Sequence, residues 1–236
     1  MTGMVAWYKA DVGVLQNTYA PSYNGSYVTY WQDQSGNGNT ATAGAWADYV
    51  TGAAPSGGPL VAFDNSPSIG FAAAVTLSTP YTVLCVFSTF SSSGPYRAVA
   101  GGLTDWLLGP YNGHIACKAG GWVCQSAGPA VVSGQLYRVA TTNSGTASTF
   151  AVDGTDHTVD GTQVSAPGVV YFGTGGSTAE GFYHGRMAEC VIYNRVLNST
   201  ELSDANTYFQ TRWLTVPTVS PGAFMVHQSV LGSGIY

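Results

Sequence analysis

Near its N-terminus the chain reads Trp31-Gln32-Asp33-Gln34-Ser35-Gly36-Asn37-Gly38-Asn39-Thr40-Ala41. Gly36 and Gly38 permit sharp chain reversals, because glycine adopts positive φ without a steric penalty. The Asp, Ser and Asn side chains around them can hydrogen-bond to the loop's own amides. We interpret the stretch as a structural loop that follows a strand.

A second interpretation of the same stretch assigns it to a metal ion. Asp33, Asn37 and Asn39, together with Asp64, offer oxygen atoms, which are the ligands that calcium prefers. The spacing matches no strict calcium loop. No other cofactor is expected.

Outward from this loop, short apolar runs alternate with turn residues, and no repeat of 20 to 50 residues is visible. In residues 81–87 both alternating sets of side chains are apolar, which indicates an interior strand. Residues 148–153 alternate, which indicates one buried face. The predicted strands are residues 4–10, 28–32, 60–63, 71–77, 81–90, 98–100, 106–108, 114–118, 122–125, 135–142, 146–152, 169–173 and 186–193.

One helix is predicted after the last strand. Asn198 and Glu201 form a capping-box pattern at its start. Its apolar face repeats every three or four residues through Leu202, Ala205, Phe209 and Trp213, and Pro217 lies beyond its end.

The quoted stretch resembles the W-x-D-x-S-G-N-G-N-x-A signature of concanavalin A-like, laminin-G-like domains. Residues 185–197, with the helix after them, are similar to the last strand of that family, and residues 60–64 and 150–154 resemble two further segments. The resemblance covers residues 4–214. It implies an all-β fold, an antiparallel two-sheet jelly-roll sandwich with one short C-terminal helix. Function would then lie on the rim loops or the concave face.

Two parts of the chain are expected, a β-sandwich over residues 1–215 and an extended apolar arm over residues 216–236. The arm's apolar side chains are candidate subunit contacts, because such a tail needs a surface to cover it. They are Phe224, Met225, Val230, Leu231, Ile235 and Tyr236.

Charge is scarce in this sequence. Only 8% of the residues are charged, and the net charge is −5. The seven basic residues are scattered, so the chain has no basic stripe for phosphates, and neither nucleic acid nor an anionic membrane is an expected partner. Residues 65–96 carry no charge, but their Ser, Thr and Pro residues argue against a membrane span.

The four cysteines show no zinc spacing. Cys85 and Cys190 lie in apolar strand patterns, so we expect buried free thiols. Cys117 and Cys124 flank a predicted hairpin turn. They are either free or joined by a disulfide in an oxidising compartment.

Catalysis is not expected. Glycanases need two close carboxylates, and the chain has only three Glu residues, at positions 180, 189 and 201. Glu189 lies in the last strand, where we expect a buried, hydrogen-bonded carboxylate. The four His residues lie in separate segments without metal-ligand spacing.

Aromatic residues are the remaining candidates for binding, because sugars stack on Tyr and Trp rings. Those in loop-like contexts are Tyr19, Tyr23, Tyr27, Trp46, Tyr49, Tyr96, Trp106 and Tyr111.

Two functions fit these observations. The first is a non-catalytic virion structural protein, a bacteriophage decoration or fibre protein, whose arm attaches it to copies of itself or to other virion proteins and whose rim contacts a host glycan. It is favoured by the apolar arm, the low charge and a start without a secretory signal pattern. The alternative is a secreted bacterial carbohydrate-binding or adhesion module, located outside the cell or on its surface.

Overall fold

The computed structural model describes residues 2–63, 71–90, 98–174 and 183–216, without the side chains of residues 44–46. This part of the chain is almost entirely β. Its strands are β1 (Met4–Lys9), β2 (Val14–Leu15), β3 (Tyr27–Trp31), β4 (Ala41–Val50), β5 (Leu60–Ala62), β6 (Phe71–Leu77), β7 (Tyr81–Thr89), β8 (Ala100–Gly102), β9 (Trp106–Tyr111), β10 (His114–Ala119), β11 (Trp122–Cys124), β12 (Leu136–Asn143), β13 (Ser148–Val152), β14 (Thr155–Asp156), β15 (Gly168–Phe172) and β16 (Gly185–Tyr193). The helix α1 (Ser199–Phe209) and the π-helical turn η1 (Gln210–Leu214) follow.

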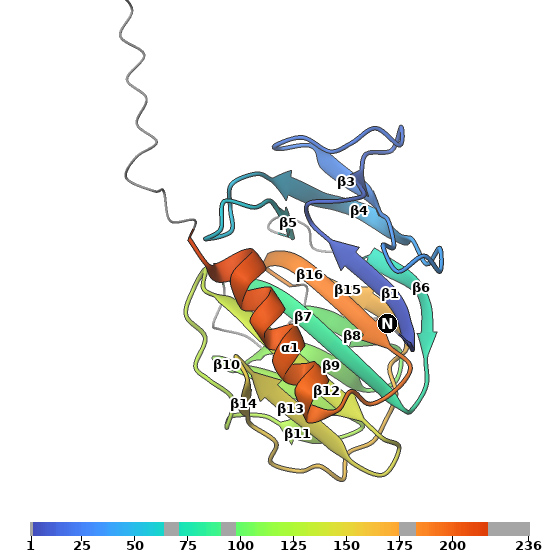
Figure 1. The fold of residues 1–236 in the computed structure, drawn as a ribbon, viewed down its shortest axis with the longest axis vertical. Coiled ribbons are helices and arrows are strands. Elements are labelled where there is room, and N and C mark those ends of the chain that lie inside the picture. The colour runs from blue at the N-terminus through green and yellow to red at the C-terminus, as the bar shows by residue number, and fades with distance from the viewer. Residues whose placement is uncertain (1, 64–70, 91–97, 175–182, 217–236) are drawn as a thin grey trace, which may run out of the picture.

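The strands form one continuous antiparallel sheet that folds over into two layers (Figure 1). The first layer runs β11-β10-β9-β8-β15-β6-β4, with β3 and β2 beyond β4. The second runs β16-β7-β12-β13-β14, with β1 also paired to β16, and β5 links the two layers by pairing with both β4 and β16. The predicted all-β antiparallel sandwich with one short C-terminal helix is confirmed.

Aromatic side chains fill the space between the layers. Tyr8 of β1 packs edge-on against Phe172 of β15, with ring centroids 5.2 Å apart, and Trp31 of β3 packs against Phe71 of β6 at 5.9 Å. All four are fully buried. The Tyr8–Phe172 pair joins the two layers, and the Trp31–Phe71 pair packs side chains of the first layer together.

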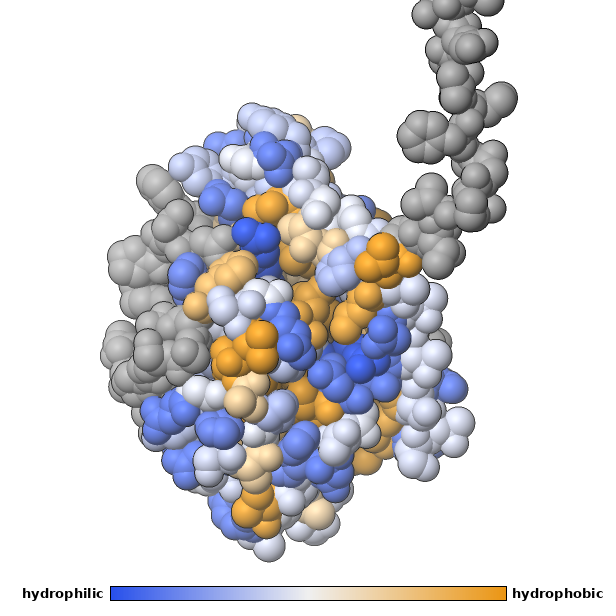
Figure 2. Space-filling model, turned by 90° about the vertical axis from the view of Figure 1, so that its left-hand side faces the viewer, coloured by the Kyte–Doolittle hydropathy of each residue, from blue (hydrophilic) through white to orange (hydrophobic). Residues whose placement is uncertain are grey.

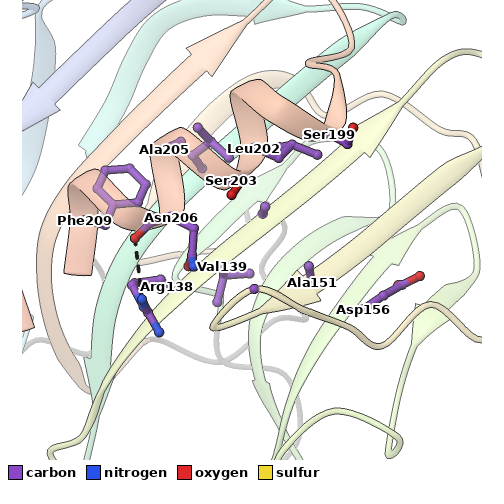
Figure 3. Close-up of a pocket in the computed structure, with 13 residues that line it drawn as sticks. Arg138, Val139, Ala151, Asp156, Ser199, Leu202, Ser203, Ala205, Asn206 and Phe209 are labelled. Carbon is purple, nitrogen blue, oxygen red and sulfur yellow. Dashed lines mark hydrogen bonds between the residues drawn. The ribbon is translucent and has the colours of Figure 1, made fainter. Parts of the chain in front are cut away.

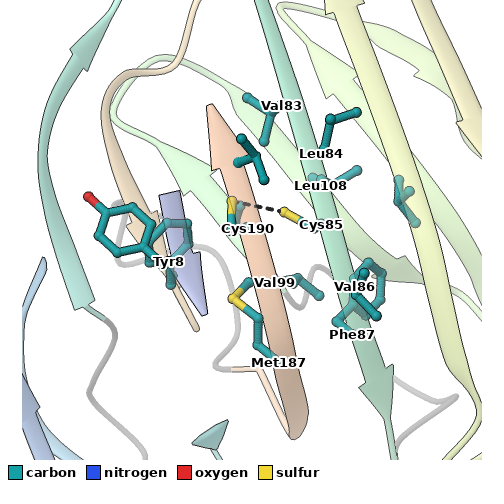
Figure 4. Packing of buried hydrophobic residues seen from close by; sticks show 14 of the residues in the cluster. Tyr8, Val83, Leu84, Cys85, Val86, Phe87, Val99, Leu108, Met187 and Cys190 are labelled. Carbon is teal, nitrogen blue, oxygen red and sulfur yellow. Dashed lines mark hydrogen bonds between the residues drawn. The ribbon is translucent and has the colours of Figure 1, made fainter. Parts of the chain in front are cut away.

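Strand β7 lies at the centre of the second layer, between β16 and β12. All nine of its residues are buried, as the doubly apolar pattern predicted. Its Cys85 faces Cys190 of β16, with the two Sγ atoms 3.2 Å apart (Figure 4). Both are buried free thiols, as expected, and burial raises the pKa of Cys190 well above its usual value.

Cys117 and Cys124 lie opposite each other across the β10–β11 hairpin, which the turn between them predicted. Both are buried free thiols in the structure. The structure therefore shows Cys117 and Cys124 without a disulfide between them.

The helix α1 begins with the predicted capping box. The Asn198 side chain accepts from the Glu201 amide, and the Glu201 carboxylate accepts from the Asn198 amide. In Figure 1 α1 crosses the outside of the second layer, over β7, β12 and β13. It buries Phe209, and η1 buries Trp213, which anchors the helix to the sheet.

Four strands differ most from the prediction. Strand β4 was missed because Ala and Gly, which are depleted in strands, make up most of residues 41–47. The two-residue strands β2 and β14 were also missed. Strand β8 begins where the predicted strand ends, because Gly101 and Gly102 have no side chains to show a pattern. Gly102 is required there, since a Cβ would lie 2.3 Å from the carbonyl oxygen of Pro167.

Hydrophobic and hydrophilic residues are interspersed over the side of the molecule in Figure 2. Among the residues that the structure describes, no helix combines the length and the apolar character that crossing a membrane requires.

Candidate functional site

The segment that contains β2 and β3 carries three of the predicted ligand-binding tyrosines. Tyr19, Tyr23 and Tyr27 are 64%, 66% and 57% exposed. Large aromatic side chains are usually covered in a folded protein. Three exposed rings within nine residues of sequence therefore mark this segment as a candidate contact surface.

Tyr19 has an unusual backbone. Its φ is +58°, in the left-handed region, and its amide donates to the carbonyl of Gln16 at 3.0 Å to close a tight turn. In the described parts of the chain, the other non-glycine residues with positive φ are Asp105, Asn112 and Asp153. Asp and Asn tolerate this conformation, whereas a tyrosine there costs roughly 1–2 kcal/mol. Such strain is typically kept where function needs it.

The ring of Tyr19 lies flat on the ring of Tyr30 in β3. The ring centroids are 4.3 Å apart and the planes are tilted by only 9°. The Tyr19 hydroxyl beside it raises the pKa of Tyr30. The turn therefore holds an exposed aromatic ring in a fixed position above the sheet.

Tyr30 belongs to a row of side chains that crosses the first layer. In the strand register Leu15 lies opposite Tyr30, Tyr30 opposite Thr42, Thr42 opposite Ala72, and Ala72 opposite Tyr171. Their chain neighbours fill the core, so the row lies on the outer face of the layer. Those buried neighbours are Val14, Trp31, Ala41, Phe71 and Phe172. We call these five residues, Leu15 to Tyr171, the outer-face row.

The outer-face row places small residues between two tyrosines. Thr42 and Ala72 separate Tyr30 from Tyr171, and Ala74 of β6, two residues from Ala72, is also exposed. Tyr30 and Tyr171 are three strands apart, about 14 Å at the usual strand spacing. Aromatic rings can stack on the apolar faces of sugars, while the Thr and Tyr hydroxyls can bond to sugar hydroxyls.

Tyr30 and Tyr171 were not among the predicted site residues. Both lie inside strands, and the sequence shows only that each is aromatic. Their place in one row depends on the pairing of β3, β4, β6 and β15, which no local signal fixes.

The other predicted aromatic residues lie elsewhere. Tyr49 is half-buried in β4, and burial raises its pKa. Tyr111 is half-buried at the end of β9, with its ring 4.4 Å from that of Trp122. Neither belongs to the outer-face row.

The prediction that Trp106 is an aromatic binding residue in a loop is wrong. It is fully buried in β9, and its indole N–H donates to the Tyr81 hydroxyl at 2.7 Å. Residues 106–110 of β9 are all buried, so Trp106 belongs to the core and not to a surface loop.

Several predicted site residues lie outside the described residues. They are Asp64, Tyr96, the side chain of Trp46, and the arm residues Phe224, Met225, Val230, Leu231, Ile235 and Tyr236.

Asp33, the first predicted calcium ligand, is engaged with its own loop. Its Oδ1 accepts from the amides of Trp7 (2.9 Å) and Ser35 (2.8 Å), and its Oδ2 accepts from the Ser35 hydroxyl (2.8 Å) and the Asn39 amide (3.1 Å). The side-chain amides of Asn37 and Asn39 donate to backbone carbonyls of β1. The motif thus ties its loop to the first strand. In the chain as far as the structure describes it, no group of three His, Cys, Asp or Glu residues is placed to hold a metal ion.

Glu189 is the buried, hydrogen-bonded carboxylate that the sequence predicted. It is fully buried in β16 and accepts from the indoles of Trp7 (2.5 Å) and Trp213 (2.6 Å) and from the Tyr208 hydroxyl (3.1 Å). The Arg212 Nε lies 3.6 Å away. Burial raises the pKa of Glu189, although these donors act in the opposite direction. Its partners join β1, β16, α1 and η1.

A pocket of about 260 Å³ lies between α1 and strands β7, β12 and β13 (Figure 3). Ala140, Ala151 and Ala205 leave this space because their side chains are small. Arg138 also lines it, but its Nε is 3.0 Å from Asp153 Oδ1, so its charge is paired. We interpret the pocket as a packing gap beneath the helix.

No protein-family model matches this sequence, and no curated protein matches it either. Solved structures with a similar fold do exist. Domain 4 of AbnA, a GH43 extracellular arabinanase from Geobacillus stearothermophilus, in complex with arabinotriose, is 15% identical with a TM-score of 0.62, over 85% of this chain and 97% of that one.

Two other similar structures come from larger proteins. The binding domain of Paraclostridial Mosquitocidal Protein 1 is 14% identical with a TM-score of 0.59, and the match covers 88% of this chain and 52% of that one. Trypanosoma rangeli sialidase in complex with the inhibitor DANA is 17% identical with a TM-score of 0.60, over 87% of this chain. The chain spans only 33% of that sialidase. At these identities the likeness shows the fold alone.

Proposed function

We propose that this chain is a non-catalytic carbohydrate-binding module that binds glycan on the outer-face row. The observation that carries the proposal is Tyr19, an exposed aromatic ring held in a strained backbone conformation and stacked on Tyr30. The fold is shared with an arabinanase domain in complex with arabinotriose and with the binding domain of a toxin, which supports the same function.

The two glutamates that the structure describes support a non-catalytic role. Hydrolysis of a glycoside needs two carboxyl groups facing one substrate. Glu189 is enclosed by two indoles and a tyrosine, and Glu201 is bound by Arg195 at 2.6 Å. Neither lies on the outer-face row.

A glycan array, followed by calorimetric titration with arabinotriose and with the best array ligands, tests the proposal. Tyr30→Ala removes the lower ring of the stacked pair and is expected to weaken binding about tenfold, as the loss of an aromatic contact would. Val159→Ala, which trims an exposed side chain in the loop after β14, is the control. Full-length protein that binds no glycan on the array would refute the proposal.

The resemblance to concanavalin A-like, laminin-G-like domains belongs to this proposal too. It is supported by the Asp33 loop, whose hydrogen bonds explain why Asp, Ser and Asn stand at their positions in the motif.

As a second candidate, we propose that the module works in a virion, as a bacteriophage decoration or fibre protein, and not as a secreted or cell-surface module. The apolar residues within positions 217–236 favour it, because they suit attachment to a second copy or to another virion protein. Comparing the native mass of the full chain with that of a chain ending at Val216 tests the attachment.

A further inference from the structure

The basic residues that the structure describes lie away from the outer-face row. Of the six basic residues in the described part of the chain, five lie in or beside the second layer. They are Lys9 in β1, Arg138 in β12, Arg186 in β16, Arg195 after β16, and Arg212 in η1. The remaining one, Lys118 in β10, belongs to the first layer.

Lys118 does not supply a free charge to the row. Its Nζ lies 2.5 Å from Asp105 Oδ1 and 5.6 Å from the centroid of the Trp122 ring. It is also three strands from Tyr171, across β8 and β9, which is about 14 Å. Beyond about 10 Å a charge is largely screened at physiological salt.

The row itself consists of neutral side chains, and the whole chain carries a net charge of −5. At the row, a carboxylated sugar would therefore lose hydration and gain no cation from the residues that the structure describes, which is unfavourable. An uncharged sugar meets rings and hydroxyls, which suit it.

The row is also longer than one sugar ring. Tyr19, stacked above Tyr30, stands at one end, and Tyr171 stands three strands away. Thr42 and Ala72 between them are too small to block a chain that crosses the strands.

We propose, as an extension of the proposed function, that the outer-face row selects uncharged oligosaccharides, with Tyr19 and Tyr171 as two separate stacking positions. Tyr19 is pre-positioned by its turn, so little freedom is lost when the sugar binds. Tyr171 contacts a later residue of the same oligosaccharide.

Matched glycan pairs test the selectivity. Full-length protein is titrated with neutral oligosaccharides and with the same oligosaccharides carrying a sialic or uronic acid, at low and at physiological salt. We expect at least tenfold weaker binding of the acidic member, and affinity for the neutral member that does not change with salt. Tighter binding of the acidic member would overturn the selectivity but leave the proposed function intact. Binding of neither member would refute the proposed function itself.

Tyr19→Asn tests the first stacking position. Asparagine tolerates the left-handed backbone, so this variant removes the ring and relieves the strain. We expect an equal or higher Tm together with about tenfold weaker glycan binding. Unchanged glycan affinity in this variant would overturn the role of Tyr19, because the Tm measurement shows separately that the variant is folded.

Tyr171→Ala tests the second position through ligand length. We expect weaker binding of a long neutral oligosaccharide and unchanged binding of its disaccharide fragment, with Val159→Ala as the control for both. An equal effect on the two ligands, or none on the longer one, would overturn the second position.

Discussion

Glu189 shows how a single buried charge fixes several elements of this fold. A carboxylate without water is stable only when donors replace its hydration. Here the donors come from β1, α1 and η1. One side chain of β16 therefore determines the positions of the first strand and of the C-terminal end of the helix. Its sequence context predicted burial, but the sequence contains no signal that pairs it with Trp7 and Trp213.

We predict that Glu189→Gln lowers the free energy of unfolding by about 1–3 kcal/mol. Glutamine keeps one acceptor oxygen and presents an N–H group to the other indole, which leaves a buried donor unsatisfied. Denaturant titration measures the loss. Tyr208→Phe, which removes the outermost donor, is the milder comparison, and glycan binding should not change. Wild-type stability in the Gln variant would show that this network is unimportant.

The Asp33 side chain gives a second prediction. Because both carboxylate oxygens already accept two hydrogen bonds each, we expect the same Tm in excess EDTA as in excess calcium. Asp33→Ala should lower the free energy of unfolding by about 2–3 kcal/mol, since it leaves several donors unsatisfied. A Tm that rises with calcium would instead favour the alternative in which Asp33, Asn37 and Asn39 bind the ion.

Among the elements, the helix was predictable because its signal is local, and β4 was not because its partners are distant in sequence. Asn198 and Glu201 cap α1 through contacts only three residues apart, so the signal is local. Strand β4 is defined by partners in β3, β5 and β6, and its Ala and Gly residues give little local signal for a strand.

The cap of α1 predicts a pH dependence. The Arg195 guanidinium, bound to both oxygens of Glu201, lowers the pKa of that carboxyl to about 2. An unfolded Glu titrates near 4.3. The contribution is therefore present above about pH 4.3 and is lost as the pH falls toward 2. Unfolding free energies measured across this range should fall less in Glu201→Gln than in the wild type.

The matched control for this effect is Asp204→Asn, an exposed acid on the same helix. It should retain the wild-type loss of stability in acid. If Glu201→Gln and the wild type lose the same stability between pH 4.5 and pH 2, the Arg195 contact does not stabilise the helix.

For the whole molecule, the sequence was enough to predict the sandwich but not the face that we propose for binding. Strands and turns are local features that the sequence shows. The outer-face row combines residues 15 to 171, so it exists only once five strands have paired in one register. Tyr19 was a candidate because of its loop context, whereas Tyr30 and Tyr171 lie inside strands and were not candidates.

The part of the molecule beyond the helix gives the last prediction. Among the described residues the core extends from Ala6 to Trp213, and a chain that ends at Val216 keeps all of these core residues. We expect the shortened chain to have the Tm and the glycan affinity of the full chain. If residues 217–236 attach to a second copy, the full chain should have the native mass of an oligomer and the shortened chain that of a monomer. Equal subunit numbers in the two chains would contradict attachment between copies, and a lower Tm in the shortened chain would show that the segment stabilises its own sandwich.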